Sequence, residues 1–255
     1  MITLTEAQLS AWLSPLLWPF FRVLAVFTAA PVFSNRAFPM RSKVGLALLV
    51  ALCAQPSLNG QPQVSFIGPQ ALETLIQQVG IGLAMGFAVQ IVFAAMELAG
   101  ELIGLQMGLN FATFFDPSSH TQSSAVSIFF GHMTVLLFIV MNGHLLVLLA
   151  VIRSFDAFPV GGSLMQMLGK VRLFDLGAEL FSSALWIAMP MIAMLLLVNL
   201  TLGIISRVAP QMNIYAIGFP VTLTVGLLGI SVTLPMLDHP YSALFARAID
   251  LFVAH

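Results

Sequence analysis

The feature that most constrains this chain is a set of long segments without a single charged side chain. Ala125–Ile152 contains no Asp, Glu, Lys or Arg, and neither do Thr74–Met96 and Ile214–Leu237. A helix needs about 20 apolar residues to cross a hydrocarbon core of about 30 Å. Charged residues make up 7% of the whole chain, against about 25% in soluble proteins. The sequence therefore predicts a membrane-type protein whose surface faces lipid or other proteins.

An all-α fold follows, because a backbone in lipid must satisfy its hydrogen bonds internally. A β-barrel would show short segments of alternating polarity instead. There is no low-complexity tract, clear repeat or second domain, so residues 1–255 are expected to form a single unit. The first charge is Glu6 and the first basic residue is Arg22, whereas a secretory signal starts with basic residues. We therefore expect the apolar segments to remain in the mature protein.

The apolar runs do not fit a plain bundle of membrane-spanning helices. Val44–Ala54 and Leu102–Phe115 are too short to span, and Ala125–Ile152 and Leu176–Ser206 are much too long. Such mismatch can be absorbed by tilt, kinks or oligomerisation. Counting six spans also places two basic clusters on opposite sides of the membrane, against the positive-inside rule. We expect broken helices and helical hairpins that pack largely against other proteins.

Several classes of function lack support in the sequence. The net charge is -1, which argues against a nucleic-acid partner. The single cysteine, Cys53, excludes an internal disulfide and a cysteine-based zinc cluster. His120, His132 and His144 are twelve residues apart, a spacing that does not place them on one helix face, so no metal site is expected. No nucleophile elbow or phosphate-binding loop occurs. The sequence therefore predicts no cofactor and no enzymatic activity.

Glu97 and Glu101 are the carboxylates that interrupt the apolar stretch following Thr74. Residues four apart share one helix face, and two like charges there need a partner, water or a changed protonation state. One interpretation is a proton relay or the wall of a wet cavity. The other is a surface turn near the bilayer edge, or pairing with a partner subunit.

Small residues recur at helical spacing in the same region. Gly100, Gly104 and Gly108 are four apart and are expected to form a smooth ridge, and Gly82 and Gly86 form a second small patch. This spacing lets helices approach closely in an apolar environment. The expected role is helix packing, within the chain or against another subunit.

An aromatic cluster follows the glycine ridge, where an apolar segment joins a polar loop. The residues of interest are Met107, Gly108, Phe111, Phe114, Phe115, Asp116 and Pro117. Such a cluster could be a pore plug or an interfacial anchor. On physical grounds alone the anchor is favoured, because aromatic side chains prefer membrane interfaces.

A polar segment between two apolar runs carries the most specific pattern in the chain. Its marked residues are Arg207, Pro210, Gln211, Asn213, Gly218 and Pro220. Proline removes a backbone donor and breaks helices, and the amide side chains can satisfy the backbone groups freed there. This pattern predicts a tight, polar-capped helical hairpin.

These last residues resemble the signature hairpin of the FliR/SctT family of type III export-gate proteins. Two further segments are similar to that family: Gly104–Pro117, which reads GLQMGLNFATFFDP, and Pro39–Leu52, whose basic turn leads into a short apolar helix. The match runs through the chain in order. Tyr215 stands where Phe is common in the family. The GFPVTLTVG run starting at Gly218 looks more flagellar than virulence-type.

The resemblance implies one copy of this chain assembled with several P- and Q-type subunits into a closed, helical, conical channel. Residues 1–175 would be P-like and 176–255 a Q-like helical hairpin. Further implied partners are the B-type export subunit, other basal-body components, membrane lipid and unfolded substrates in transit. The implied location is the bacterial inner membrane, within the flagellar basal body. Proton-motive force and a separate ATPase would drive export, neither supplied by this chain.

The resemblance also implies that residues 108–122 project into the channel as a plug, with Phe111, Phe114 and Phe115 as the blocking side chains. This reverses the preference for an interfacial anchor. The competing hypothesis is a proton-coupled secondary transporter of a small solute, using Glu97 and Glu101. Transporters usually contain internal repeats around a midplane site, and no such repeat is visible here.

Overall fold

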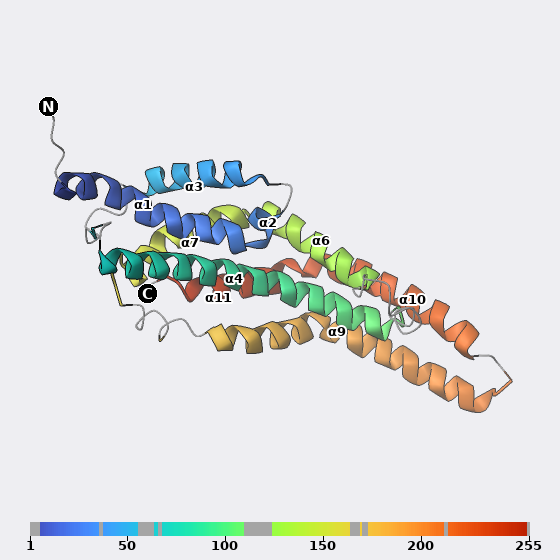
Figure 1. Ribbon diagram of the computed structural model, residues 1–255. Helices are drawn as coiled ribbons and strands as arrows, with labels where there is room; N and C mark the ends of the chain where they lie inside the picture. Colours follow the sequence, from blue (N-terminus) through green and yellow to red (C-terminus); the bar gives the residue numbers. More distant parts are fainter. Residues whose placement is uncertain are drawn as a thin grey trace, which may run out of the picture. The chain divides into compact units, whose positions relative to one another are not determined.

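The computed structural model describes residues 6–35, 38–55, 64–65, 68–109, 124–163, 169, 173–211 and 214–253. All regular elements within these ranges are helical, as the uncharged runs predict. They are α1 (Glu6–Ala29), α2 (Pro31–Ser34), α3 (Met40–Ala54), α4 (Pro69–Gln106), α6 (Ala125–Val140), α7 (Gly143–Ala157), α9 (Leu173–Val208), α10 (Ile214–Thr233), the 3-10 turn η2 (Leu234–Met236) and α11 (Asp238–Asp250) (Figure 1).

Four of these helices are long and apolar enough to cross a membrane: Trp12–Ala29, Pro69–Gln106, Asp175–Val208 and Ile217–Met236. They differ in how much of their surface other parts of the chain cover. The most apolar window is 67% buried in α4, but 22% in α9 and 28% in α10. Helix α4 is therefore an internal helix, whereas α9 and α10 present apolar side chains outward.

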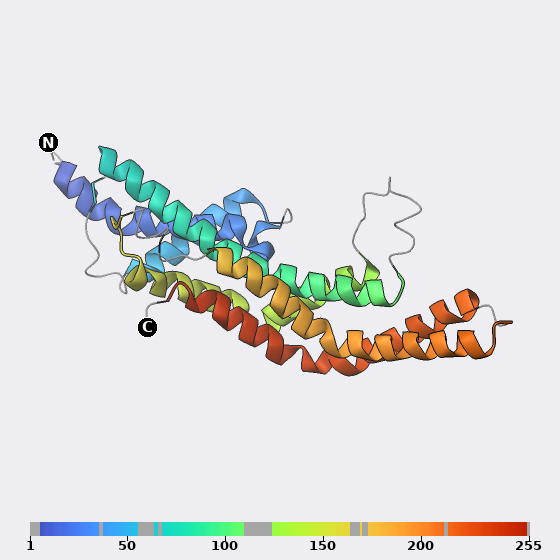
Figure 2. The ribbon, with the colours of Figure 1, turned by 90° about the horizontal axis from the view of Figure 1, so that it is seen from below.

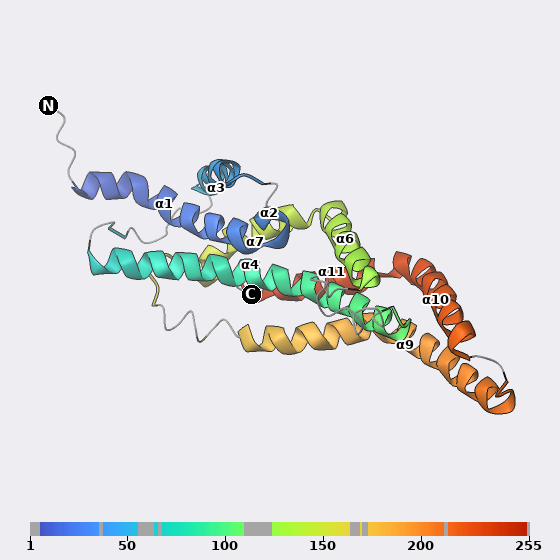
Figure 3. The same cartoon turned by 45° about the vertical axis from the view of Figure 1, so that its right-hand side comes forward.

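The long uncharged run that starts at Ala125 is broken, as its length predicts. Helices α6 and α7 are bent by 66° at the break (Figure 3). Asn142 makes the bend with a positive φ of 55°, a conformation that asparagine tolerates better than most residues. Gly143 follows directly and lies against the ring of Phe138, where a side chain would clash.

Two other runs differ from the expected pattern. Helix α4 continues through Glu97 and Glu101 without a break, because carboxylates on one helix face leave the backbone hydrogen bonds intact. The run from Leu176 to Ser206 is also one helix, since α9 passes through Pro190. The broken and the continuous helices thus cannot be told apart by length alone.

The described chain forms two compact units, both built from separate segments. Unit 1 comprises Met1–Ile91, Phe138–Leu176 and Phe245–His255, and unit 2 comprises Val92–Leu137 and Gly177–Leu244. The suggested division into a P-like part and a Q-like part near residue 175 stays a prediction.

Within unit 1, α1 packs along α3 (Figure 1). The first part of α4 also approaches α1 closely, through the small patch of Gly82 and Gly86. A Cβ atom at Gly82 would clash with the Arg22 carbonyl, and one at Gly86 would lie 3.0 Å from the Ala30 nitrogen.

Within unit 2, α9 and α10 run side by side as a hairpin (Figures 1 and 2). Gly229 of α10 allows this approach, because a Cβ there would lie 2.7 Å from the Met191 sulfur of α9. The hairpin that the polar segment predicts is therefore present, with α9 ending at Val208 and α10 beginning at Ile214.

Candidate gating site

The C-terminal end of α4 is closed by a glycine in the left-handed region. Gly108 has φ +79°, its N–H donates to the Leu105 carbonyl at 3.1 Å, and the Leu109 N–H donates to the Gly104 carbonyl at 3.1 Å. This pair of bonds is the Schellman motif, which satisfies the last carbonyls of a helix. Gly108 thus ends α4, and among the described residues the atom nearest to the position of its Cβ is Phe219 Cδ2, at 3.6 Å. Its spacing from Gly104 does not extend the packed ridge.

The N-terminal end of α6 is capped from two directions. The Ser124 side chain accepts from the Ser127 N–H at 3.1 Å, as an N-cap serine does. The Glu101 carboxylate, on α4, accepts from the Ser124 N–H at 2.9 Å. A glutamate inside the same helix supplies this second bond in the usual capping box. Here α4 supplies it, so the end of one helix holds the beginning of the next.

Two glycines of α4 let α6 approach closely enough for this cap. A Cβ on Gly100 would lie 2.9 Å from the Ser127 Cα, and one on Gly104 would lie 2.6 Å from the Ser124 Oγ. The Ser127 hydroxyl also donates to the Glu97 carbonyl at 2.9 Å. Gly100 and Gly104 therefore pack a helix of the same chain, one of the two alternatives that their spacing left open.

Helix α10 forms the third side of the site. The Thr222 hydroxyl lies 3.2 Å from the Met107 carbonyl and 3.1 Å from the Gly218 and Phe219 carbonyls of its own helix, so its one proton is shared among these acceptors. The Met107 side chain is fully buried, and a Cβ on Gly226 would lie 2.6 Å from its sulfur. Met107, which directly follows α4, is thus held against α10 by this shared hydrogen bond and by close packing.

We call this arrangement the clamp, defined as Gly100, Glu101, Gly104, Met107, Ser124 and Thr222. All six residues belong to unit 2. The clamp brings Leu109 and Ser124, which flank residues 110–123, to the same place in the fold. The expected plug residues Phe111, Phe114, Phe115, Asp116 and Pro117 lie outside the described residues.

The two carboxylates on α4 have different surroundings. Glu101 is half-buried and caps α6, whereas the Glu97 side chain is exposed beside α6. A Cβ on Gly131 would lie 3.0 Å from Glu97 Oε1. Glu101 thus has a structural role as a helix cap, and a proton relay through Glu97 and Glu101 stays a prediction.

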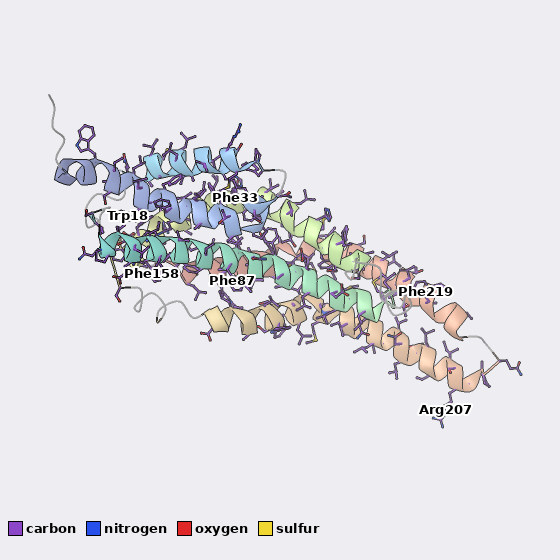
Figure 4. The ribbon with its side chains drawn as sticks, in the orientation of Figure 1. Trp18, Phe33, Phe87, Phe158, Arg207 and Phe219 are labelled. Atoms are coloured by element: carbon purple, nitrogen blue, oxygen red, sulfur yellow. The ribbon has the colours of Figure 1, made fainter. Side chains whose placement is uncertain are left out.

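The residues of the polar hairpin are distributed over the end of α9, the turn after it and α10. Arg207 and Gln211 are exposed, and Arg207 projects from the end of the hairpin (Figure 4). Pro210 lies in the turn after α9, and Asn213 lies outside the described residues. Gly218 and Pro220 lie inside α10. Pro220 does not end the helix there, and the Thr224 hydroxyl donates to its carbonyl at 2.8 Å.

Sequence reasoning missed three residues of structural consequence. Ser124 is the last of several polar residues before an apolar run, and Thr222 lies inside such a run, so nothing in their spacing marks them. Arg22 did carry a signal, as the lone charge in the apolar run that begins at Leu9. Its side chain is completely buried in unit 1, against polar groups of α4 and α7.

Comparison with known proteins adds the family. Residues 13–248 match the family described as "Bacterial export proteins, family 1". The chain belongs to this family. The chain is also 40% identical over 257 aligned residues to "Flagellar biosynthetic protein FliR" of Escherichia coli K12, which covers 98% of this chain and 97% of the relative. The protein of the same name from Aquifex aeolicus is 29% identical over 241 residues, covering 94% and 93%.

Membership of bacterial export proteins, family 1, agrees with the resemblance inferred from the sequence. The matched residues include the whole clamp and the whole α9–α10 hairpin. Relatives with the same printed name include one from Pectobacterium carotovorum, at 40% identity over 253 residues. The chain is accordingly a membrane component of the flagellar protein export apparatus.

Proposed function

We propose that this chain is a structural and gating subunit of the flagellar export channel. It assembles with P- and Q-type subunits into a closed gate in the bacterial inner membrane, within the basal body, and it contacts the B-type export subunit. Unfolded flagellar proteins pass through the channel. The chain itself catalyses no reaction and needs no cofactor.

The observation that carries this proposal is the clamp at the two ends of residues 110–123. A loop whose ends are fixed together by helix caps and close glycine contacts keeps its position while its own residues are displaced. Apolar rings in a narrow path exclude water and block ions. Binding and gating elements are often loops positioned by a rigid scaffold. A plug made of Phe111, Phe114 and Phe115 and anchored by the clamp would block ions and could still be displaced during export.

The outward apolar side chains of α9 support an assembly with other subunits. Leu197, Leu200, Ile204 and Val208 are 66%, 62%, 58% and 79% exposed, respectively. Their spacing of three or four residues forms one stripe along α9. Exposed apolar stripes of this kind lie against lipid or a partner protein, and a Q-type helical hairpin is a matching surface.

Co-purification tests the proposed assembly. A tagged copy of this chain is expressed together with the P- and Q-type subunits of the same operon, and the purified material is weighed by native mass spectrometry. We expect one large complex that contains a single copy of this chain and several copies of each partner.

A stable, lone monomer or dimer would contradict the proposal and favour the transporter hypothesis. In that case proton-coupled uptake should be measured with Glu97→Gln and Glu101→Gln. A transporter would lose uptake in these variants. An export-gate subunit would show no uptake to lose.

A further inference from the structure

Arg22 of α1 is buried with every nitrogen of its guanidinium engaged. Nε donates to Gln78 Oε1 at 2.8 Å, Nη1 donates to the Ser154 hydroxyl at 2.9 Å, and Nη2 donates to the Phe158 carbonyl at 2.7 Å. The Phe155 ring stacks against the same group, with its centroid 3.6 Å from the guanidinium carbon. One side chain thus joins α1 to α4 and to α7, all within unit 1.

The partners of Arg22 that the structure describes are neutral, so its charge is compensated in another way. Phe158 is the C-cap of α7, and Ser154 lies in the last turn of that helix. The C-terminal end of a helix carries a partial negative charge from its free carbonyls. The face of an aromatic ring is also attractive to a cation. The end of α7 therefore serves as the counter-charge for the guanidinium.

Helix α4 reinforces this contact from the other side. Gln78 is completely buried, and its Nε2 donates to Gln77 Oε1 at 3.4 Å. Gln77 in turn donates to the Pro159 carbonyl at 3.3 Å. Consecutive carbonyls after α7, those of Phe158 and Pro159, accept hydrogen bonds from different helices. Lipid offers these groups no hydrogen-bond partner, so they are satisfied by contacts within the protein.

We propose that Arg22, Gln78, Ser154 and the Phe158 carbonyl form a latch that closes unit 1. An unsatisfied arginine is costly in an apolar environment. Burial of α1 is therefore stable only when α4 and the end of α7 are both in place. The latch makes the completion of unit 1 all-or-none, and an incomplete chain is left open and unfit for incorporation into a larger assembly. This inference does not depend on the proposed gating role.

A cysteine probe on α7 measures whether unit 1 is closed. Cys53 is replaced by alanine, and Val147→Cys places a thiol at a side chain that is 2% exposed. The rate at which a membrane-permeant maleimide labels full-length chain in membranes reports opening of α7. Arg22→Met should raise this rate by about tenfold or more, because the acceptors on α4 and α7 lose a charged donor. Arg153→Met is the matched control, since Arg153 is exposed on the same helix, and it should leave the rate unchanged.

Two further variants separate the latch from simple loss of packing. Arg22→Lys keeps the charge but loses the planar fork and the stacking on Phe155, so labelling should still rise. Adding Gln78→Leu and Ser154→Ala to Arg22→Met removes two of the three acceptors of Arg22, so that only the Phe158 carbonyl loses its charged donor. Labelling should fall back toward the original rate, because an apolar replacement of buried polar groups is often tolerated.

The latch is overturned if Arg22→Met or Arg22→Lys labels at the original rate, or if the triple variant labels as fast as Arg22→Met. If the Arg22→Met chain does not accumulate in membranes, Gln78→Leu alone replaces it as the test variant. Gln78→Leu should raise the labelling rate by a smaller factor than Arg22→Met. An unchanged labelling rate in Gln78→Leu would also overturn the latch. All readings are taken on the chain itself, so they are separate from any failure of the gating proposal.

Discussion

Gly104→Leu is expected to disrupt the clamp and to destabilise the chain by about 3 kcal/mol or more, at the upper end of the cost of overpacking. Even a Cβ at this position would lie 2.6 Å from the Ser124 Oγ and 2.9 Å from its Cβ. The obstruction is the cap of α6, which cannot shift without breaking the bond to the Glu101 carboxylate. The measurement is the thermal unfolding temperature of the purified chain or complex in detergent.

Gly45→Leu is the matched control for this substitution. Gly45 lies inside α3, and no atom of the residues that the structure describes lies within 4 Å of the position of its Cβ. Replacing a helical glycine at an open position should be neutral or should stabilise the helix, by roughly 0.5–1 kcal/mol for alanine. Equal unfolding temperatures for the two variants would show that α4 and α6 are not closely packed at the clamp.

The second large effect is expected from shortening side chains on the outer stripe of α9. Replacing Leu197, Leu200 and Ile204 together by alanine keeps the helix apolar, so membrane insertion should be retained. The buried contacts that a partner hairpin would make with these side chains are lost, and truncation of central interface residues costs about 1–3 kcal/mol each. Recovery of the complex with P- and Q-type subunits should fall by about tenfold or more, since each 1.4 kcal/mol is tenfold in affinity.

Alanine at three exposed leucines of α3 provides the comparison. Leu48, Leu49 and Leu52 are 41%, 62% and 45% exposed, and they lie outside the α9–α10 hairpin. Complex recovery should be affected less by these changes than by those on α9. If the α9 variant is recovered in the complex as well as the unaltered chain, its stripe faces lipid and not a partner subunit.

The helical fold and its irregularities were predictable to different degrees. The uncharged runs require helices, but of the two runs that are much too long, the one from Ala125 is broken and the one from Leu176 is continuous. The polar residues around Pro210 correctly predicted the turn of a hairpin. The helices and this turn follow from local chemistry: charged side chains are absent from the runs, and proline lacks a backbone donor.

Where the structure differs from the interpretation of the sequence, the cause is a tertiary contact between residues that are distant in the sequence. From the sequence, Glu101 is interpreted as an intramembrane charge. In the structure its carboxylate accepts a hydrogen bond from the Ser124 N–H, 23 positions further along the chain, and so caps α6. Pro220 reads as a helix breaker, yet it is accommodated within α10. The latch around Arg22 joins residues separated by up to 136 positions, and no periodicity connects them. Sequence patterns locate such residues but do not reveal what satisfies them.

The position of the candidate site in the sequence was easier to predict than the contacts that form it. The glycine spacing predicts a contact surface; Gly100 and Gly104 lie against α6 in the structure, whereas Gly108 ends α4. The aromatic segment was located by its resemblance to export-gate proteins, and its blocking role stays a prediction. The contributions of Met107 and Thr222 to the clamp could be seen only in the structure, because no sequence pattern indicates which groups a buried carbonyl contacts.

Ion conductance tests the gating account most directly. Residues 110–122 are replaced by a short Gly-Ser linker that still joins Leu109 to Ser124, so the clamp is retained, and the variant is assembled with its P- and Q-type partners. Complexes of confirmed composition are then placed in planar bilayers. The account predicts a closed gate for the unaltered complex and a steady ion leak for the shortened one. An equally low conductance in a correctly assembled, shortened complex would contradict it.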